Sequence, residues 1–231
     1  KPDTALLRNN DPFYIPDFTQ EVHYECELVV RIDRLARHIA PRFAHRLYAE
    51  VGLGIDFTAR DLQREAIANG WPWERAKGFD YSAAVAPQFV PVAELGDIRQ
   101  LHFTLEINGE VRQRGYTGDM IFGVDELLSH VSRYITYRTG DLFFTGTPAG
   151  AGPVERGDVL RATLEGRCCW PRTRRGGSSC CATADSTTRS STATKSKSAT
   201  PRDCRRTTCR SSCRNSKATP IPNRSPQTTS S

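Results

Sequence analysis

Two glutamates near the start of the chain, Glu25 and Glu27, lie two residues apart in a segment that alternates apolar and polar side chains. On a strand, residues two apart project from the same face, and two carboxylates this close repel each other unless a cation or a proton lies between them. Asp56, at a predicted strand-to-helix junction, adds a third carboxylate. This all-oxygen set suits Mg²⁺, Mn²⁺ or Ca²⁺ better than Zn²⁺. The alternative is the solvated face of a half-exposed strand, and the spacing alone does not decide between the two.

Polar and cationic residues follow the third carboxylate at helical spacing. Arg60 and Gln63 are three apart and therefore share a helix face, where they could grip an oxygen-rich, anionic substrate beside a cation. Arg60 taken alone could instead pair with Asp61 or Glu65 in the same helix. Lys77 is either a second cationic contact or a surface lysine.

A Gly-rich segment, TGTPAGAG at 145–152, follows a predicted strand. It lacks the lysine and the spacing of a phosphate-binding P-loop, so no nucleotide site is predicted. Its backbone amides and the Thr147 hydroxyl can meet a substrate carboxylate or a developing oxyanion, and the alternative is an ordinary tight turn. The histidines are interpreted as surface or packing residues, because none lies in an H-E-x-x-H or nucleophile motif: His23, His38, His45, His102 and His130.

The elements that carry the carboxylates can be predicted from the hydrophobic pattern. Residues 22–32 alternate as a strand with one buried face and one polar face, and 53–57 form a second short strand. Thr58 and Asp61 resemble a capping box at the start of a helix that Gly70 ends. The third carboxylate thus lies where a strand gives way to a helix.

The rest of the first 167 residues also reads as short elements. Asn108-Gly109 predicts a two-residue hairpin turn, and Asp125 is predicted to cap a helix that reaches about Tyr137. Three more strands are predicted at 101–108, 141–148 and 157–166. Because short strands outnumber helices, the pattern favours a β-rich α+β domain rather than a doubly wound sheet.

Charge and cysteine content both change after Arg167. Residues 1–167 carry 19 Lys and Arg against 24 Asp and Glu, a net charge of −5, whereas the last 64 residues carry 13 against 2, a net charge of +11. Cys26 is the one cysteine of the first part. This cysteine content, without a signal-peptide pattern, predicts a cytoplasmic protein. No apolar run approaches the roughly eighteen residues of a membrane span, so no membrane partner is expected.

Residues 168–231 have a composition that predicts disorder. They contain 25 Ser and Thr and 7 Cys, but no Leu, Val, Phe, Met or Tyr, and cannot bury enough apolar surface to offset their ordering entropy. We interpret this tail as an out-of-frame translation, which the genomic DNA read in all frames around codon 168 would test. A genuine basic tail that binds RNA or a membrane surface is the alternative. Trp170 is its only aromatic residue, and stacking platforms need more, so nucleic-acid binding is not favoured.

The segments HYECEL, GIDFTARDLQ, AKGFDYSAAVAP, NGEVRQ, FTGTPAGAGPVERGDVL and LEG occur in this order across residues 1–167. Together they resemble the fumarylacetoacetate hydrolase family. The resemblance implies a mixed β-roll core, of the type of that family's C-terminal domain, and a bound Mg²⁺, or else Mn²⁺ or Ca²⁺. The implied metal ligands are Glu25, Glu27 and Asp56. The implied contacts to a dicarboxylate or β-keto acid are Arg60, Gln63, Lys77 and Thr147, with catalytic roles for Lys77 and Gln63.

The resemblance also implies a class of reaction. Members of the family hydrolyse acylpyruvates and similar carbon–carbon bonds, isomerise hydroxylated dienoic diacids, or act on oxaloacetate as decarboxylases or tautomerases, commonly as cytoplasmic homodimers. We therefore expect a metal-dependent hydrolase or isomerase, with the oxaloacetate reactions as the alternative. The family's His and Glu dyad lies on a lid N-terminal to the position of Lys1, so we expect an N-terminal piece to be missing. A different class of alternative is an inactive fragment, or a binding protein with a nucleic-acid-binding tail.

Overall fold

Most of the strands that the structure describes belong to two sheets that share a hydrophobic core. The computed structural model describes residues 1–168 and 182–185, which lie within the compact unit Lys1–Arg189. The first sheet has the strand order β1-β7-β5-β4-β11, with β8 paired to β5. Its strands are β1 (Leu6–Leu7), β4 (Cys26–Ile32), β5 (Tyr48–Asp56), β7 (Ala83–Val85), β8 (Val90–Pro91) and β11 (Leu142–Phe144).

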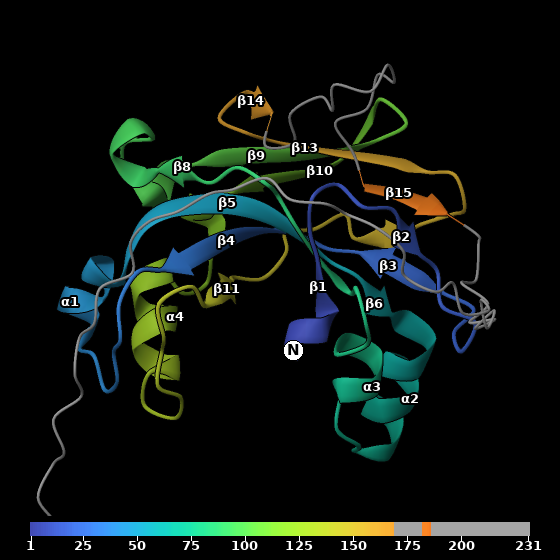
Figure 1. Cartoon of the computed structure of the whole chain (residues 1–231), viewed down its shortest axis with the longest axis horizontal. Coiled ribbons are helices and arrows are strands. Elements are labelled where there is room, and N and C mark those ends of the chain that lie inside the picture. The colour runs from blue at the N-terminus through green and yellow to red at the C-terminus, as the bar shows by residue number, and fades with distance from the viewer. Residues whose placement is uncertain (169–181, 186–231) are drawn as a thin grey trace, which may run out of the picture. The chain divides into compact units, whose positions relative to one another are not determined.

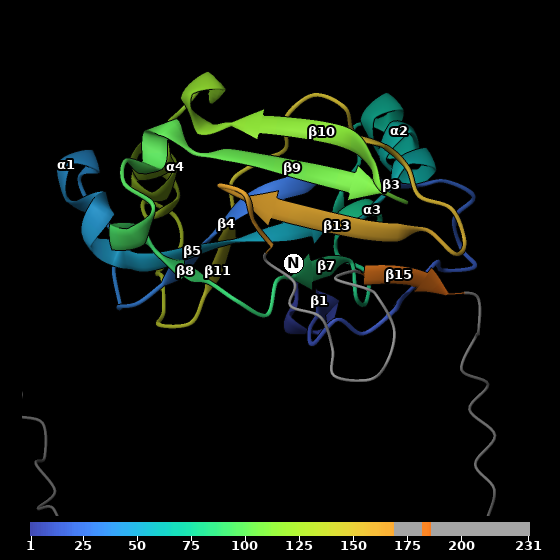
Figure 2. The same cartoon turned by 90° about the horizontal axis from the view of Figure 1, so that it is seen from above.

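The second sheet lies over one face of the first (Figures 1 and 2). Its order is β10-β9-β13-β15-β2, with β14 paired to β13. Its strands are β2 (Phe13–Tyr14), β9 (His102–Ile107), β10 (Glu110–Tyr116), β13 (Val159–Leu164), β14 (Arg167–Cys168) and β15 (Ala182–Asp185). A small third sheet has the order β12-β3-β6, with strands β3 (Val22–Tyr24), β6 (Thr58–Ala59) and β12 (Gly152–Pro153). Parallel and antiparallel pairs both occur, so the predicted β-rich, mixed α+β fold is confirmed.

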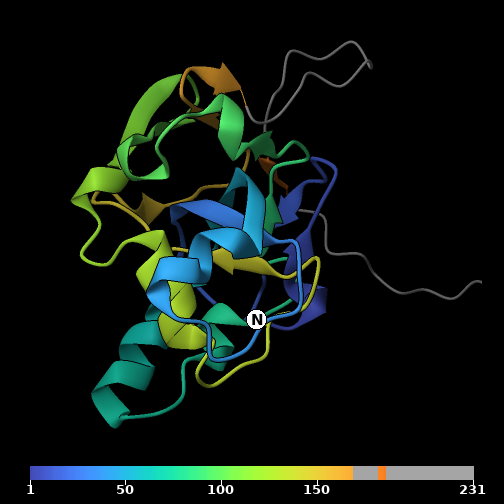
Figure 3. The same ribbon diagram turned by 90° about the vertical axis from the view of Figure 1, so that its left-hand side faces the viewer.

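The helices are short and lie at two ends of the first sheet. Figures 1 and 3 show α1 beside α4, and Figure 1 shows α2 beside α3 at the other end. The α-helices are α1 (Pro41–Ala44), α2 (Arg60–Asn69), α3 (Glu74–Lys77) and α4 (Val124–Val131). The 3₁₀ helices are η1 (Asp3–Ala5), η2 (His45–Leu47), η3 (Val92–Glu94), η4 (Ile98–Gln100) and η5 (Thr117–Asp119).

Large apolar side chains from both main sheets fill the core. Leu28 and Leu53 from the first sheet and Leu105 and Leu160 from the second are all fully buried. Close packing also explains a glycine in β5, because a Cβ atom on Gly54 would lie 2.6 Å from Phe144 Cε1 and 2.8 Å from Val29 Cγ2. The strand that ends at Asp56 is therefore held tightly between its neighbours.

The strand predicted at 22–32 is divided, and its predicted polar face is buried. The chain leaves the third sheet after β3 and enters the first sheet as β4, and Glu25 lies at the change between them. On the face predicted to be polar, Glu27 is only 4% exposed and Val29 is fully buried. The alternative of a solvated, half-exposed strand is therefore wrong, since both faces of β4 are buried around Glu27.

The predicted helix starts were wrong, although both helices exist. α2 begins at Arg60, Thr58 belongs to β6, and no side chain caps the helix start. α2 does end at Gly70, whose φ of 65° is the left-handed conformation that glycine adopts readily. In α4, Glu126 Oε2 accepts a hydrogen bond from Gly123 N at 2.9 Å, whereas Asp125 accepts one from the Tyr48 hydroxyl.

α4 is also shorter than its apolar pattern predicts. It ends at Val131 rather than near Tyr137, because the chain beyond it pairs with a distant segment: Tyr137 N donates to Ala36 O at 2.9 Å. The Ser132 hydroxyl fixes the turn by accepting a hydrogen bond from Ile39 N at 3.0 Å. Local hydrogen bonds continue as far as Ile135 N, which donates to Val131 O at 3.0 Å, and the chain then leaves the helical path to pair with Ala36.

Other local predictions have clear outcomes. The Asn108-Gly109 turn joins β9 to β10, and both residues have the positive φ of a tight hairpin turn, 54° and 85°.

Ala182–Asp185, within the tail expected to be disordered, form β15. Residues 169–181 and 186–231 lie outside the described residues, so the interpretation of the tail stays a prediction. Among the described residues, none of the helices has the length and apolar character needed to cross a membrane.

Candidate metal centre

Three acidic side chains converge where β4 and β5 run side by side. β4 and β5 pair antiparallel, and Asp56 N donates to Glu25 O at 2.8 Å, so the end of β5 lies against the start of β4. One oxygen from each of Glu25, Glu27 and Asp56 lies within 4.8 Å of the other two. The three residues are 8%, 4% and 9% exposed. The predicted common face of the two glutamates, with the aspartate beside it, is therefore what the structure shows.

Three cations contact this carboxylate cluster, namely Lys1, Arg60 and Lys77. Lys77 Nζ lies 2.7 Å from Glu25 Oε2 and 3.1 Å from Asp56 Oδ2. Arg60 Nη2 lies 2.8 Å from Glu25 Oε1. The alternatives in which Arg60 pairs within its own helix and Lys77 is a surface lysine are wrong, because the two side chains are only 23% and 21% exposed and contact the cluster.

Two of the three carboxylates accept few hydrogen bonds from the described residues. Asp56 Oδ1 is buried and has no hydrogen-bond donor among the described residues, although Lys1 Nζ lies 2.7 Å away as an ion pair without hydrogen-bond angles. Glu27 accepts one hydrogen bond, from Gly146 N at 2.7 Å. Burial, and then the charges of Asp56 and Glu25, raise the pKa of Glu27 to about 7. A buried set of three carboxylates of this kind fits a hard divalent cation.

The Gly-rich loop is fixed to β4 at Cys26. Thr147 Oγ1 donates to Cys26 O at 2.8 Å and accepts from Gln113 Nε2 at 2.9 Å. Gln113 Oε1 in turn accepts from Cys26 N at 3.0 Å. The Thr147 proton is thus used within the protein, and so is the Gly146 N–H, which donates to Glu27 Oε2 at 2.7 Å. Substrate binding by Thr147 stays a prediction.

Arg60 and Gln63 share a helix face as predicted, and they contact each other. Arg60 Nη1 donates to Gln63 Oε1 at 2.5 Å. Gln63 is 6% exposed, so its amide is fixed beside the cluster rather than in solvent. The Arg60 guanidinium and the Gln63 amide together present N–H groups to an anion that binds beside the cluster.

Sequence reasoning missed several residues of the site. Lys1 donates to Ser82 O and Oγ at 3.1 and 3.0 Å, and burial lowers its pKa although Asp56 opposes the shift. Its position depends on the parallel pairing of β1 with β7, which no local pattern predicts. His23 was interpreted as a surface or packing residue, yet its ring accepts a hydrogen bond from Arg60. Gln113 had no signal beyond its place on a strand.

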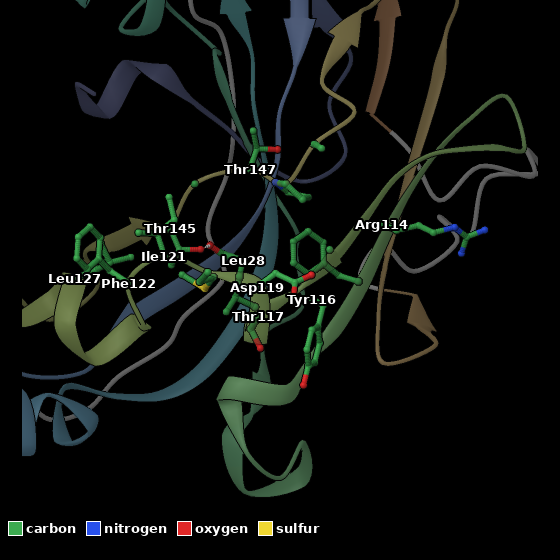
Figure 4. A pocket seen from close by; sticks show the side chains of 16 residues that line it. Leu28, Arg114, Tyr116, Thr117, Asp119, Ile121, Phe122, Leu127, Thr145 and Thr147 are labelled. Carbon is green, nitrogen blue, oxygen red and sulfur yellow. Dashed lines mark hydrogen bonds between the residues drawn. The ribbon is translucent and has the colours of Figure 1, made fainter.

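A separate cavity of about 530 Å³ lies on the opposite face of β4 (Figure 4). Leu28 lines it, and neighbouring residues of a strand point to opposite faces, so Glu27 points away from it. The cavity and the carboxylate cluster share a wall, because Gly146 lines the cavity while its N–H reaches Glu27. The polar groups that could do chemistry gather at the cluster and not in this mostly apolar cavity.

Comparison with known proteins gives concordant matches. Residues 1–172 match the family described as Fumarylacetoacetate (FAA) hydrolase C-terminal. The chain is 40% identical over 167 residues to oxaloacetate tautomerase YcgM of Escherichia coli K12, covering 72% of this chain and 76% of that protein. It is 39% identical over 166 residues to the human mitochondrial oxaloacetate tautomerase FAHD1, covering 72% and 75%.

A solved structure is similar over the same region. It is the crystal structure of fumarylpyruvate hydrolase from Pseudomonas aeruginosa in complex with Mn²⁺ and pyruvate. The match has 36% sequence identity and a TM-score of 0.68, and it covers 72% of this chain and 73% of that one. The similarity therefore extends to both fold and sequence.

Proposed function

The chain belongs to the fumarylacetoacetate hydrolase family, whose relatives named above are enzymes, and on that premise we propose that it is a divalent-metal-dependent isomerase or hydrolase of small β-keto diacids. Keto–enol tautomerisation of oxaloacetate is the reaction we place first, since the curated relatives at about 40% identity carry that name. The observation that carries the proposal is the buried cluster of three carboxylates, whose oxygens lie close enough together to bind one cation.

The charge of the site supports a dicarboxylate as substrate. Lys1, Arg60 and Lys77 bring three positive charges to the three carboxylates. A divalent cation would add two more positive charges, and a dianionic substrate would balance them. A buried excess of charge is costly unless it is paired, so a diacid is favoured over a monoacid.

The residues of the chain can be given roles in such a reaction. Glu25, Glu27 and Asp56 would hold Mg²⁺ or Mn²⁺, with Ca²⁺ as a further option, and the cation supplies a Lewis acid when it is bound. The free N–H groups of Arg60 bind a substrate carboxylate. Lys77 Nζ has three protons, of which two point at Glu25 and Asp56, and it is placed to hold or move a proton at the reacting carbonyl.

A second candidate reaction is the hydrolysis of an acylpyruvate. The observation that favours it is the similar solved structure, which is a fumarylpyruvate hydrolase in complex with Mn²⁺ and pyruvate. Hydrolysis also needs a base that activates water, whereas tautomerisation needs a proton acceptor and donor for the substrate itself. The residues described above supply the proton acceptor and donor of tautomerisation more directly than the base that hydrolysis needs.

The test is an assay of the full chain with oxaloacetate, following the ultraviolet absorbance of the enol with Mg²⁺ or Mn²⁺ present. We expect acceleration that a chelator abolishes and added metal restores. Acetoacetate, a β-keto acid with one carboxylate, should react with a kcat/KM about 10 to 100 times lower, because one set of charge-assisted hydrogen bonds is lost. Cleavage of an acylpyruvate without tautomerase activity would favour the second candidate. No metal-dependent reaction with either class would contradict the proposal.

We also propose a homodimer in the cytoplasm. The dimer is supported by exposed apolar side chains just before α4: Ile121 is 91% and Phe122 is 60% exposed, and neighbouring apolar groups of this kind are typical of interaction surfaces. The cytoplasmic location is supported by the single cysteine among residues 1–167. Light scattering on the purified chain should give twice the mass of 25.8 kDa, and a monomer at micromolar concentration would refute the dimer.

A further inference from the structure

We infer that His23 is a positioning residue for Arg60, and that Glu21 holds the His23 ring in the tautomer that this role requires. The inference rests on the proposed function in one respect, because it assigns the Arg60 guanidinium to a carboxylate of the substrate. The geometry that carries it lies in three consecutive contacts, from Glu21 to His23, from His23 to Arg60, and from Arg60 to Glu25.

The Arg60 guanidinium is held on three sides. Nη2 donates to Glu25 Oε1 at 2.8 Å, Nη1 donates to Gln63 Oε1 at 2.5 Å, and Nε donates to His23 Nδ1 at 3.3 Å. A guanidinium has five N–H groups in one plane. Three are used in these contacts, so one N–H on each Nη remains for a substrate carboxylate. The contacts at Nη1 and Nη2 hold the outer end of the guanidinium. The contact with His23 holds its third nitrogen, Nε, and so fixes the orientation of the guanidinium plane.

The His23 ring can accept at Nδ1 only if that nitrogen carries no proton. Glu21 provides the reason why it does not, since Glu21 Oε1 lies 2.7 Å from His23 Nε2 and takes the ring N–H on that side. Glu21 is itself held by the Arg64 guanidinium, whose Nη1 lies 3.2 Å from Glu21 Oε1. The carboxylate therefore sets the tautomer, and the tautomer sets the donor–acceptor direction toward Arg60.

Backbone pairing explains why residues so far apart in sequence meet here. β3 pairs antiparallel with β6, and His23 stands opposite Thr58. Directly after this pair, Arg60 N donates to Glu21 O at 2.8 Å. The His23 side chain is only 16% exposed, so the ring lies against the start of α2. This register brings the His23 ring of β3 beside Arg60, the first residue of α2, which follows β6.

The first experiment reads the contact itself and does not depend on turnover. Nitrogen NMR of the full chain, metal-free or with Mg²⁺, should show His23 as the neutral Nε2–H tautomer and an Arg60 Nε–H signal protected from solvent exchange. The Arg60 signal should persist in His23→Asn, since the Asn oxygen can take the place of Nδ1, and should lose its protection in His23→Leu. An Arg60 signal that is unchanged in His23→Leu would overturn the inference.

The second experiment reads the consequence for substrate. In the oxaloacetate assay His23→Leu should raise KM about tenfold, the effect of one charge-assisted hydrogen bond, with kcat and Mn²⁺ affinity changed less than about twofold. His23→Asn should recover most of the loss. His45→Leu, the same substitution at an exposed histidine, is the matched control and should behave as the natural chain.

The outcomes separate the inference from the proposed function. If the natural chain does not act on oxaloacetate, the proposed function fails while the NMR contact still decides the role of His23. If turnover is present but His23→Asn is no better than His23→Leu, the ring acts by packing and the positioning role is refuted. A fall in kcat without a rise in KM would also refute it.

Discussion

Glu27→Gln is expected to make the metal-free protein more stable at about pH 8 and to remove the stabilisation that Mn²⁺ gives the natural chain. Glu27 is 4% exposed, and burial, with the charges of Asp56 and Glu25, raises its pKa to about 7. The folded state therefore keeps this proton to a higher pH than the unfolded state, whose glutamate has its ordinary pKa. Stability falls as the pH rises from about 4.5 to about 7, by about 3 kcal/mol in all.

The amide of glutamine cannot ionise, so this pH-dependent loss should disappear in the variant. The measurement is urea unfolding at about pH 5 and pH 8, in chelator and in excess Mn²⁺. In the natural chain Mn²⁺ at a hundred times its Kd should add about 2.7 kcal/mol, and in Glu27→Gln it should add little. Glu106→Gln, a partly buried glutamate of β9, is the control. Equal stabilisation of both variants by Mn²⁺ would exclude Glu27 as a ligand.

Lys77→Met is expected to lower kcat on oxaloacetate by about 100-fold to 10,000-fold, the usual effect of removing a group that transfers a proton. The same variant should bind Mn²⁺ more tightly than the natural chain, because Lys77 Nζ occupies oxygens of Glu25 and Asp56 at 2.7 and 3.1 Å and competes with the metal for them. These opposite effects distinguish a catalytic role from a role in building the metal site.

The two quantities are measured by the enol absorbance assay and by titration with Mn²⁺. Arg75→Met changes an exposed cation on the same short helix, α3, and should alter neither quantity. Unchanged kcat in Lys77→Met would remove Lys77 from the catalytic machinery. Loss of Mn²⁺ binding together with kcat would instead give the lysine a structural role.

Much of the site could be predicted from local sequence because its signals are short-range. The alternation around Glu25 and Glu27 places both carboxylates on one face, since side chains alternate along any strand. The spacing of Arg60 and Gln63 fixes a common helix face in the same way. Asn108-Gly109 predicts a hairpin because few other dipeptides adopt its backbone angles. Each of these properties belongs to a few consecutive residues.

Other features depend on which distant segments pair, and local sequence does not contain that information. The partner of Arg60 is Glu25, 35 residues away, rather than the nearer Asp61 or Glu65. Lys1 reaches Asp56 only because β1 pairs with β7, and α4 stops early because the chain after it pairs with Ala36.

The sequence by itself thus predicted that Glu25 and Glu27 share one face, and which elements carry the three carboxylates of the cluster. The tertiary structure decided how those carboxylates are buried, which cations balance them, and that His23 contacts Arg60. The physical reason is that local periodicity fixes the direction of a side chain relative to its own backbone. Burial and charge pairing depend instead on strand register and sheet order, which join residues far apart in the chain.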